Sequence, residues 1–217
     1  MQILHPFAGA IQQYSQQLSD PDRFRPSRCP LCHTQCPLVA HGFYRRTLVD
    51  IDFDGLIRIR RYLCRFCCGT VSLLPEFALP YLRFSVSVMA RFLLARLLHG
   101  GSLKTSAEAA GQLGMPYQRG QFWVRRFCRQ AAAVCAALVA LTAVLPAASF
   151  VVRALHMLTN TGWIPAHRFL FSELRMHLLG WPGWLAPYGR PATFAAGRDR
   201  TGVPPHSICL EGTPRPD

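Results

Sequence analysis

The sequence predicts a mostly helical fold with one small β module near its start and a pair of helices directly after that module. Three observations lead to this class. Two C-x2-C pairs enclose a strand-like stretch, segments with helical periodicity begin near residue 85, and an uncharged run fills residues 130–152. The 217 residues are enough for one larger domain or two small ones, each with a hydrophobic core.

The net charge is strongly positive. The chain has 24 Lys and Arg residues against 11 Asp and Glu residues, a charge of +13 at pH 7 with a pI near 10.0. Residues 23–80 hold nine basic and four acidic side chains, and residues 81–130 hold eight and one. This charge indicates a polyanionic partner, with nucleic acid the first candidate and an anionic membrane surface the second.

Nine cysteines would suit a disulfide-bonded protein if a secretion signal preceded them. The first 22 residues, an N-terminal segment, lack the basic start and the long apolar core of such a signal. We therefore expect a reducing compartment, the cytoplasm, where clustered cysteines usually bind a metal.

Residues 23–80 are expected to form a zinc ribbon. Zn²⁺ prefers four tetrahedral ligands, and two C-x2-C pairs supply four sulfurs. The predicted ligands are Cys29, Cys32, Cys64 and Cys67. The intervening chain can return as a hairpin, because 41–49 and 55–63 are strand-like runs and Asp54-Gly55 is a turn signal between them. A site closed by four thiolates has no open position, so its role is structural.

Other side chains near the pairs leave alternatives open. The additional candidates are His33, Cys36, His41 and Cys68. A ligand set that uses Cys36, His33 or Cys68 is one alternative, and small buried apolar roles for Cys36 and Cys68 are another. Cys128 and Cys135 are expected in a helical core, and Cys209 stands apart.

The domain expected over residues 81–152 is helical. Its first helix has a start signal at Ser85 or Ser87 and a stop signal at Gly100-Gly101. A second helix is predicted from Thr105 to Leu113, followed by a short turn that contains Gly114.

The next helix is predicted from Pro116, at the first helical position, to beyond Arg129. Two helices joined by a Gly-containing turn, the second rich in Arg, match the helix-turn-helix pattern that places the second helix in the major groove of DNA. An ordinary helical hairpin with a solvated Arg face is the alternative. Gly120 departs from the pattern, because such helices usually bury a branched apolar residue there and Gly costs about 1 kcal/mol in a helix.

The helix-turn-helix reading assigns DNA contacts. Residues free to meet base edges are Tyr117, Gln118, Arg119 and Gln121, and residues placed for phosphates are Arg125, Arg126 and Arg129. Phe122, Trp123 and Phe127 would pack against the other helices. The ribbon would present four further arginines to DNA, namely Arg45, Arg46, Arg58 and Arg60.

These segments together resemble a known family. Residues 25–130 contain, in order, CPLC, HGFYRR, IRIRRYLCRFC, SLLPEFALPY and SAEAAGQLGMPYQRGQFWVRRF. This order resembles the N-terminal part of bacterial insertion-sequence transposases and related transposon-associated proteins, in which a zinc ribbon precedes a helix-turn-helix that binds the ends of the element. The resemblance implies that the four cysteines hold Zn²⁺ and that the helix near 116–129 reads double-stranded DNA. The resemblance also implies that the protein is associated with the nucleoid.

Full transposases of this kind also carry three separated acidic residues that hold two divalent metals. After residue 130 the acidic residues here are Glu173, Asp199, Glu211 and Asp217, three of them in a Gly- and Pro-rich tail. We therefore expect a DNA-binding accessory protein without its own nuclease. A truncated or degenerate transposase and a membrane-associated zinc-ribbon protein are the alternatives. A separate transposase partner and a homodimer stay open.

Residues 130–152 are long enough to span a membrane, but they are rich in Ala and contain Pro146. A buried helix or a dimer seam is the favoured reading.

Residues 153–186 form an aromatic-rich helical segment with Trp163, Trp181 and Trp184. Its histidines, His167 and His177, are expected to be core or surface residues rather than metal ligands. Residues 187–217 are expected to be irregular.

Overall fold

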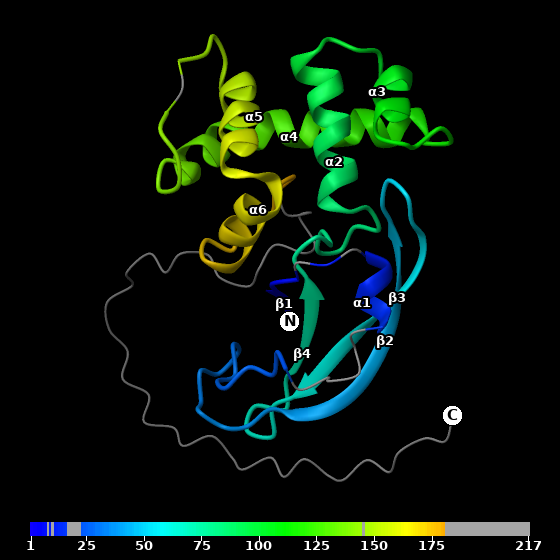
Figure 1. The fold of residues 1–217 in the computed structure, drawn as a ribbon. Helices are drawn as coiled ribbons and strands as arrows, with labels where there is room; N and C mark the ends of the chain where they lie inside the picture. The colour runs from blue at the N-terminus through cyan, green and yellow to red at the C-terminus, as the bar shows by residue number, and fades with distance from the viewer. Residues whose placement is uncertain (8, 10, 17–22, 145, 181–217) are drawn as a thin grey trace.

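The fold joins a sheet half, formed by described residues up to 80, to a helical half, formed by described residues from 81 onward (Figure 1). The structure, a computed structural model, describes residues 1–7, 9, 11–16, 23–144 and 146–180. Trp181, Trp184, Cys209 and the tail 187–217 lie outside these residues. The prediction of helices combined with a small sheet beside a cysteine cluster is confirmed at that level.

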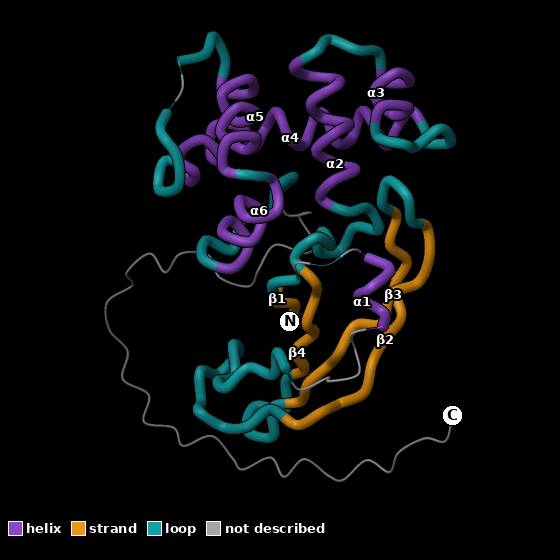
Figure 2. The backbone as a smooth tube through the Cα atoms, in the orientation of Figure 1, coloured by secondary structure: helices purple, strands orange, loops and turns teal. Residues whose placement is uncertain are grey.

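The sheet has four strands, ordered β1-β4-β3-β2 (Figure 2). Their bounds are β1 Gln2–His5, β2 Val39–Val49, β3 Asp54–Leu63 and β4 Thr70–Pro75. β3 is antiparallel to both of its neighbours, and β1 runs parallel to β4. The short helix α1 (Ile11–Gln16) follows β1.

The predicted hairpin is present, but its turn lies elsewhere. Val49 pairs with Asp54, and the N–H of Asp50 donates to Phe53 O at 2.6 Å, so residues 50–53 form the turn. The prediction of the turn at Asp54-Gly55 was wrong because both residues already belong to the ladder. Along β3, Ile57 and Ile59 are buried while Arg58 is exposed, as alternation in a strand requires.

The strands β1 and β4 were not predicted. β4 ends at Pro75, which pairs with His5 at the last position of the parallel ladder, where a missing N–H is tolerated. The segment 1–22, expected to stand apart, therefore contributes an edge strand to the same sheet that holds the cysteines.

The helical half consists of five α-helices and one π-helical turn among the described residues. Their bounds are α2 Val86–Leu93, η2 Leu94–Leu98, α3 Leu103–Ala109, α4 Tyr117–Leu138, α5 Phe150–Thr161 and α6 Trp163–Ser172. Ser85 caps α2 by accepting from the Val88 N–H at 3.1 Å, which confirms one of the two predicted starts. Gly100 follows η2 with φ +71°, as the predicted stop requires.

Three helix boundaries differ from the prediction. α3 begins at Leu103, after its cap Ser102, rather than at Thr105. α3 ends at Ala109 rather than Leu113, because Gly111 adopts φ +71° and the Gln112 N–H turns back to Ala107 O at 2.8 Å. Pro116 precedes α4 as its cap, with ψ 138°, instead of occupying its first turn.

The uncharged run does not form one buried helix. α4 ends at Leu138 and α5 begins at Phe150, and the described residues between them, 139–144 and 146–149, are not helical. Cys135 is buried as expected, but Cys128 is exposed. Among the helices that the structure describes, none combines the length and apolar character that a membrane span needs.

Most buried side chains of the two halves belong to different clusters, although Val49 and Leu79 of the sheet half are part of the helical core. Trp123 and Phe127 of α4 are buried in the helical half, and the Trp123 ring meets Phe84 and Phe92 edge-on at 4.8 and 5.2 Å. In the sheet half, α1 covers one face through Ile11 and Tyr14. A second small cluster joins Cys29 and Cys64 to buried residues Leu38, Tyr62, Val71 and Leu73.

Polar contacts fix the halves to each other. Arg168 of α6 pairs with Glu76 at 2.9 Å, and His177 Nε2 lies 3.1 Å from Pro80 O. The Ser85 hydroxyl donates to Asp50 Oδ1 in the hairpin turn. His167 and His177 are both buried at this junction.

Candidate metal centre and basic surfaces

The two cysteine pairs adopt the same backbone turn. The N–H of Cys29 donates to Thr34 O at 3.1 Å, and the N–H of Cys64, which also stands first in its pair, donates to Gly69 O at 3.0 Å. The residue after each second cysteine has a left-handed backbone, with φ +59° at His33 and +54° at Cys68. The chain therefore builds two equivalent knuckles, although neither places Gly at the left-handed position.

Backbone N–H groups point at the sulfurs. The Leu31 N–H lies 3.4 Å from Cys29 Sγ. Burial opposes ionisation of the Cys64 thiol, but the N–H groups of Cys67 and Phe66 outweigh it and lower the pKa of this thiol to about 6. Donors directed at sulfur stabilise the thiolate, which is the form that binds a metal.

The four predicted ligands meet in one cluster. The Sγ atoms of Cys29, Cys32, Cys64 and Cys67 all lie within 4.8 Å of one another. Across the knuckles, Cys29 and Cys67 are 3.8 Å apart, as are Cys32 and Cys64. A tetrahedral ion with metal–sulfur bonds of about 2.3 Å sets its ligands about 3.8 Å apart. The four cysteines can therefore hold a metal ion without rearrangement.

A fifth sulfur lies beside this cluster. Cys36 Sγ is 3.5 Å from Cys64 Sγ, and the pKa of the Cys36 thiol is raised, first by its hydrogen bond to Cys64 and then by burial and nearby sulfurs. The other additional candidates, His33, His41 and Cys68, are exposed and are not members of the group.

The centre lies at the end of the β2–β3 hairpin opposite its turn. Cys64 directly follows β3, and Cys29 belongs to the loop that leads into β2. Tyr62 and Leu38, both fully buried, pack beside the two cysteines. A bound ion would therefore fix the loop before β2 to the end of β3 and to this small core.

The outer face of the hairpin carries a basic surface, which we call the ribbon face. Its members are Phe43, Arg45, Thr47, Leu56, Arg58 and Arg60, which pair across the strands. Arg45 stands directly opposite Arg58, a pairing of like charges that weakens a sheet. The guanidinium groups of Arg58 and Arg60 lie 4.4 and 4.6 Å from the Phe43 ring centre.

Arg46 does not belong to the ribbon face. Its side chain projects from the other face of β2 and donates to Leu79 O at 3.0 Å and to Leu82 O. Burial lowers the pKa of its guanidinium. Arg46 thus binds backbone carbonyls where the halves meet, and it is not presented to DNA as predicted. Its sequence neighbour Arg45 gave no sign of this difference.

A second basic surface follows one side of α4 and is called the α4 stripe. Its members recur every three or four residues, about one turn apart, along one helix face, and all four are exposed: Gln118, Phe122, Arg125 and Arg129. Phe122 was predicted to pack inside but is 47% exposed. Tyr117 is exposed at the first turn, where its hydroxyl accepts from Gln121 Nε2 at 2.9 Å.

Arg126 and Arg119 point away from this stripe. Arg126 donates to Leu179 O at 2.8 Å and to Gly180 O at 2.6 Å, so it binds backbone carbonyls rather than facing solvent as the phosphate prediction requires. Arg119 is half-buried, with its guanidinium 5.4 Å from the Phe84 ring centre.

The contact between α3 and α4 explains the unusual Gly120. This residue is buried, and a Cβ there would lie 3.0 Å from Phe92 Cζ and 3.3 Å from Leu103 Cδ2. Gly120 therefore allows α4 to approach α2 and α3 closely. Residues 110–116 join α3 to α4 and form a longer connection than the three or four residues usual in a helix-turn-helix.

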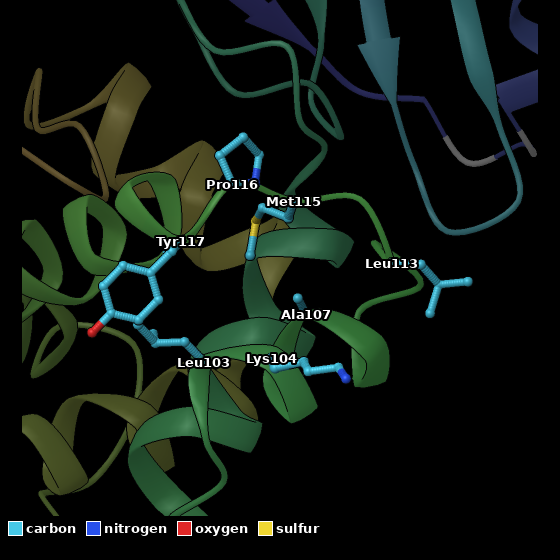
Figure 3. Close-up of a pocket in the computed structure, with 8 residues that line it drawn as sticks. Leu103, Lys104, Ala107, Leu113, Met115, Pro116 and Tyr117 are labelled. Carbon is cyan, nitrogen blue, oxygen red and sulfur yellow. The ribbon is translucent and has the colours of Figure 1, made fainter.

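A small pocket opens beside this contact (Figure 3). It measures about 100 Å³ and is lined by residues that include Leu103, Lys104, Met115 and Tyr117. Drug-sized ligands need about 300 Å³ or more, so this hollow is too small for a ligand of that size.

The acidic residues considered for catalysis do not converge in the described part of the chain. Glu173 is exposed directly after α6. Asp199, Glu211 and Asp217 lie outside the described residues. Within the described ranges, the four-cysteine cluster is the one group of three or more His, Cys, Asp or Glu side chains placed to hold a metal.

The comparison with protein families gives one match. Residues 29–109 are similar to a family described as Domain of unknown function (DUF6431). The matched stretch starts at Cys29, includes both knuckles and ends with α3, so it joins the cysteine cluster to the first helices and stops before α4. No curated protein and no solved structure matches the chain.

Proposed function

We propose that this chain is a zinc-dependent DNA-binding protein that contacts duplex DNA through the α4 stripe and the ribbon face. Its association with a transposable element, where it would act beside a separate transposase and without its own nuclease, is part of the proposal and rests on the sequence resemblance.

Zinc is the ion that this donor set favours. Four sulfurs at tetrahedral spacing suit Zn²⁺ or an iron–sulfur centre, and paired C-x2-C knuckles that end a β hairpin are typical of structural zinc. All four positions would be filled by protein, so the ion would hold the fold and leave no position for a substrate.

The observation that carries DNA binding is the exposed α4 stripe. For Arg125 and Arg129, no carboxylate lies within ion-pair distance among the residues the structure describes. Gln118 and Tyr117 occupy the first turn of the helix, where a helix that enters the major groove meets base edges. From Gln118 to Arg129 the stripe extends about 16 Å, roughly half a turn of duplex.

The ribbon face supports a second contact. Arg45 and Arg58 are both exposed and stand opposite each other, and no acidic side chain belongs to this face. Polyanion binding would offset their mutual repulsion. A two-stranded ribbon with basic side chains also fits a DNA groove.

Fluorescence anisotropy with labelled duplex DNA over a salt series tests the proposal. We expect affinity to fall steeply with salt, and Arg125→Ala with Arg129→Ala to reduce the slope of log K against log salt by about 2. The matched control, Arg125→Lys with Arg129→Lys, keeps the charge and should keep the slope. Absence of binding at low salt would exclude the proposal.

Sequence preference is tested separately. Selection from random duplex DNA should give a preferred site, and Gln118→Ala should change the preference at one or two positions by about 1–3 kcal/mol. A site that does not change would show that the first turn of α4 does not read bases.

A further inference from the structure

The centre has five sulfurs for four metal positions. Cys36 Sγ is 3.5 Å from Cys64 Sγ, closer than the 3.8 Å between the ligands paired across the knuckles. Cys36 is half-buried against the same small core as Cys29 and Cys64. The Cys36 sulfur therefore contacts a ligand sulfur directly, although Cys36 is not one of the four clustered ligands.

The four ligands differ in exposure. Cys29 and Cys64 are buried and Cys32 is intermediate, whereas Cys67 is exposed. Water, oxidants and competing thiols therefore reach Cys67 first. Cys36 lies in the stretch between the first knuckle and β2, outside any helix or strand, where a side chain can move without disturbing a ladder.

We propose that Cys36 is a reserve ligand that replaces Cys67, so that Cys29, Cys32 and Cys64 hold the ion together with either sulfur. The exchange conserves charge, because the Cys36 thiol releases its proton to solvent when it binds and the released Cys67 thiolate takes one up. The centre would then keep its ion while Cys67 is alkylated or oxidised. This inference rests on the proposed zinc centre.

Metal binding by the purified full chain tests it with zinc and cobalt(II) as probes. Charge-transfer absorption of the cobalt form reports the number of bound thiolates, and chelator competition gives zinc affinity. We expect Cys67→Ser to keep four thiolates with less than about a 10-fold loss of affinity. Cys36→Ser with Cys67→Ser should keep three thiolates and lose about 100-fold, because four ligands share the affinity of a structural zinc site.

Two controls separate the possible results. Cys36→Ser alone should match the wild type, and Cys128→Ser, an exposed cysteine on α4, should change nothing. If Cys67→Ser already shows three thiolates and the affinity of the double variant, Cys36 does not coordinate and the inference is overturned. If the wild-type chain binds no zinc, the proposed zinc centre itself fails.

Discussion

The sheet half and the helical half both carry excess positive charge, but they are built differently. The helical half has one large core in which Trp123, Phe127 and Leu155 are fully or almost fully buried. Most buried residues of the sheet half fall in two small clusters, and the cluster at the far end of the hairpin includes two of the four cysteines. The four cysteines that could hold a metal ion therefore stand where the apolar core of the molecule is smallest.

Metal removal should give the largest difference between the halves. A structural zinc site contributes about 10–16 kcal/mol of binding free energy, which is folding energy where no other core exists. We expect chelation, or Cys64→Ser, to abolish hydrogen-exchange protection in the two knuckles and in the adjoining ends of β2, β3 and β4, while amides of α4 stay protected. Equal loss of protection in both halves would show that the helical half also depends on the metal.

The second largest effect should be a loss of folding stability at low pH, caused by the histidines at the junction between the halves. Burial lowers the pKa of His167 to about 3, helped by the charge of His177, and burial lowers the pKa of His177 to about 4, opposed by Pro80 O and helped by Arg126. Below pH 6.5 these two histidines become protonated in the unfolded chain but stay neutral in the folded chain. Stability is therefore complete above pH 6.5 and falls toward pH 4, by about 2 kcal/mol for each histidine at pH 5.

Urea unfolding followed by helical circular dichroism at pH 7.5 and pH 5 measures this effect. His167→Leu places an apolar side chain of similar size in the buried site and cannot titrate, so it should remove about half of the acid sensitivity. An unchanged difference between the two pH values would place the acid-sensitive groups elsewhere, for example at the cysteines.

A substitution in the helical half should have a smaller effect. Gly120→Val places atoms against Phe92 and Leu103 and should destabilise the helical half by about 2–3 kcal/mol, while zinc affinity stays unchanged. Gly114→Ala is the matched control, because a Cβ there meets nothing within 4 Å. Thermal unfolding with zinc titration measures both quantities, and a loss of zinc affinity in Gly120→Val would contradict the separation of the halves.

The smallest predicted effect concerns the ribbon face and has opposite signs for stability and binding. Arg45→Thr removes the like-charge pair with Arg58, so we expect the sheet half to gain about 0.5 kcal/mol. The same change should weaken DNA binding and lower the salt slope by about 1. Arg45→Lys is the control, and a gain in both stability and affinity would exclude the ribbon face as a DNA contact.

The sequence was informative where a signal is local. C-x2-C spacing brings two sulfurs to one turn whatever surrounds them, and the four predicted ligands do converge. Ser85 and Gly100 marked the ends of a helical segment because capping and left-handed φ depend on neighbouring residues. The alternation of Ile57, Arg58 and Ile59 predicted a strand for the same reason.

Other features depended on partners distant in sequence. β1 and β4 pair between residues about 70 positions apart, and no local pattern marks either strand. Arg46 and Arg126 resemble their neighbours Arg45 and Arg125 in sequence, yet they bind carbonyls 33 to 54 positions away. The uncharged run contained a helix end that its composition did not indicate.

By itself, then, the sequence determined which four cysteines meet, the excess of positive charge and the start of α2, since each follows from residue type and near neighbours. Only the tertiary structure decided which arginines face solvent, why Gly120 is required, and that Cys36 stands beside the ligands. These outcomes depend on which backbone groups need hydrogen-bond partners and how closely elements pack, and both are set when distant segments meet.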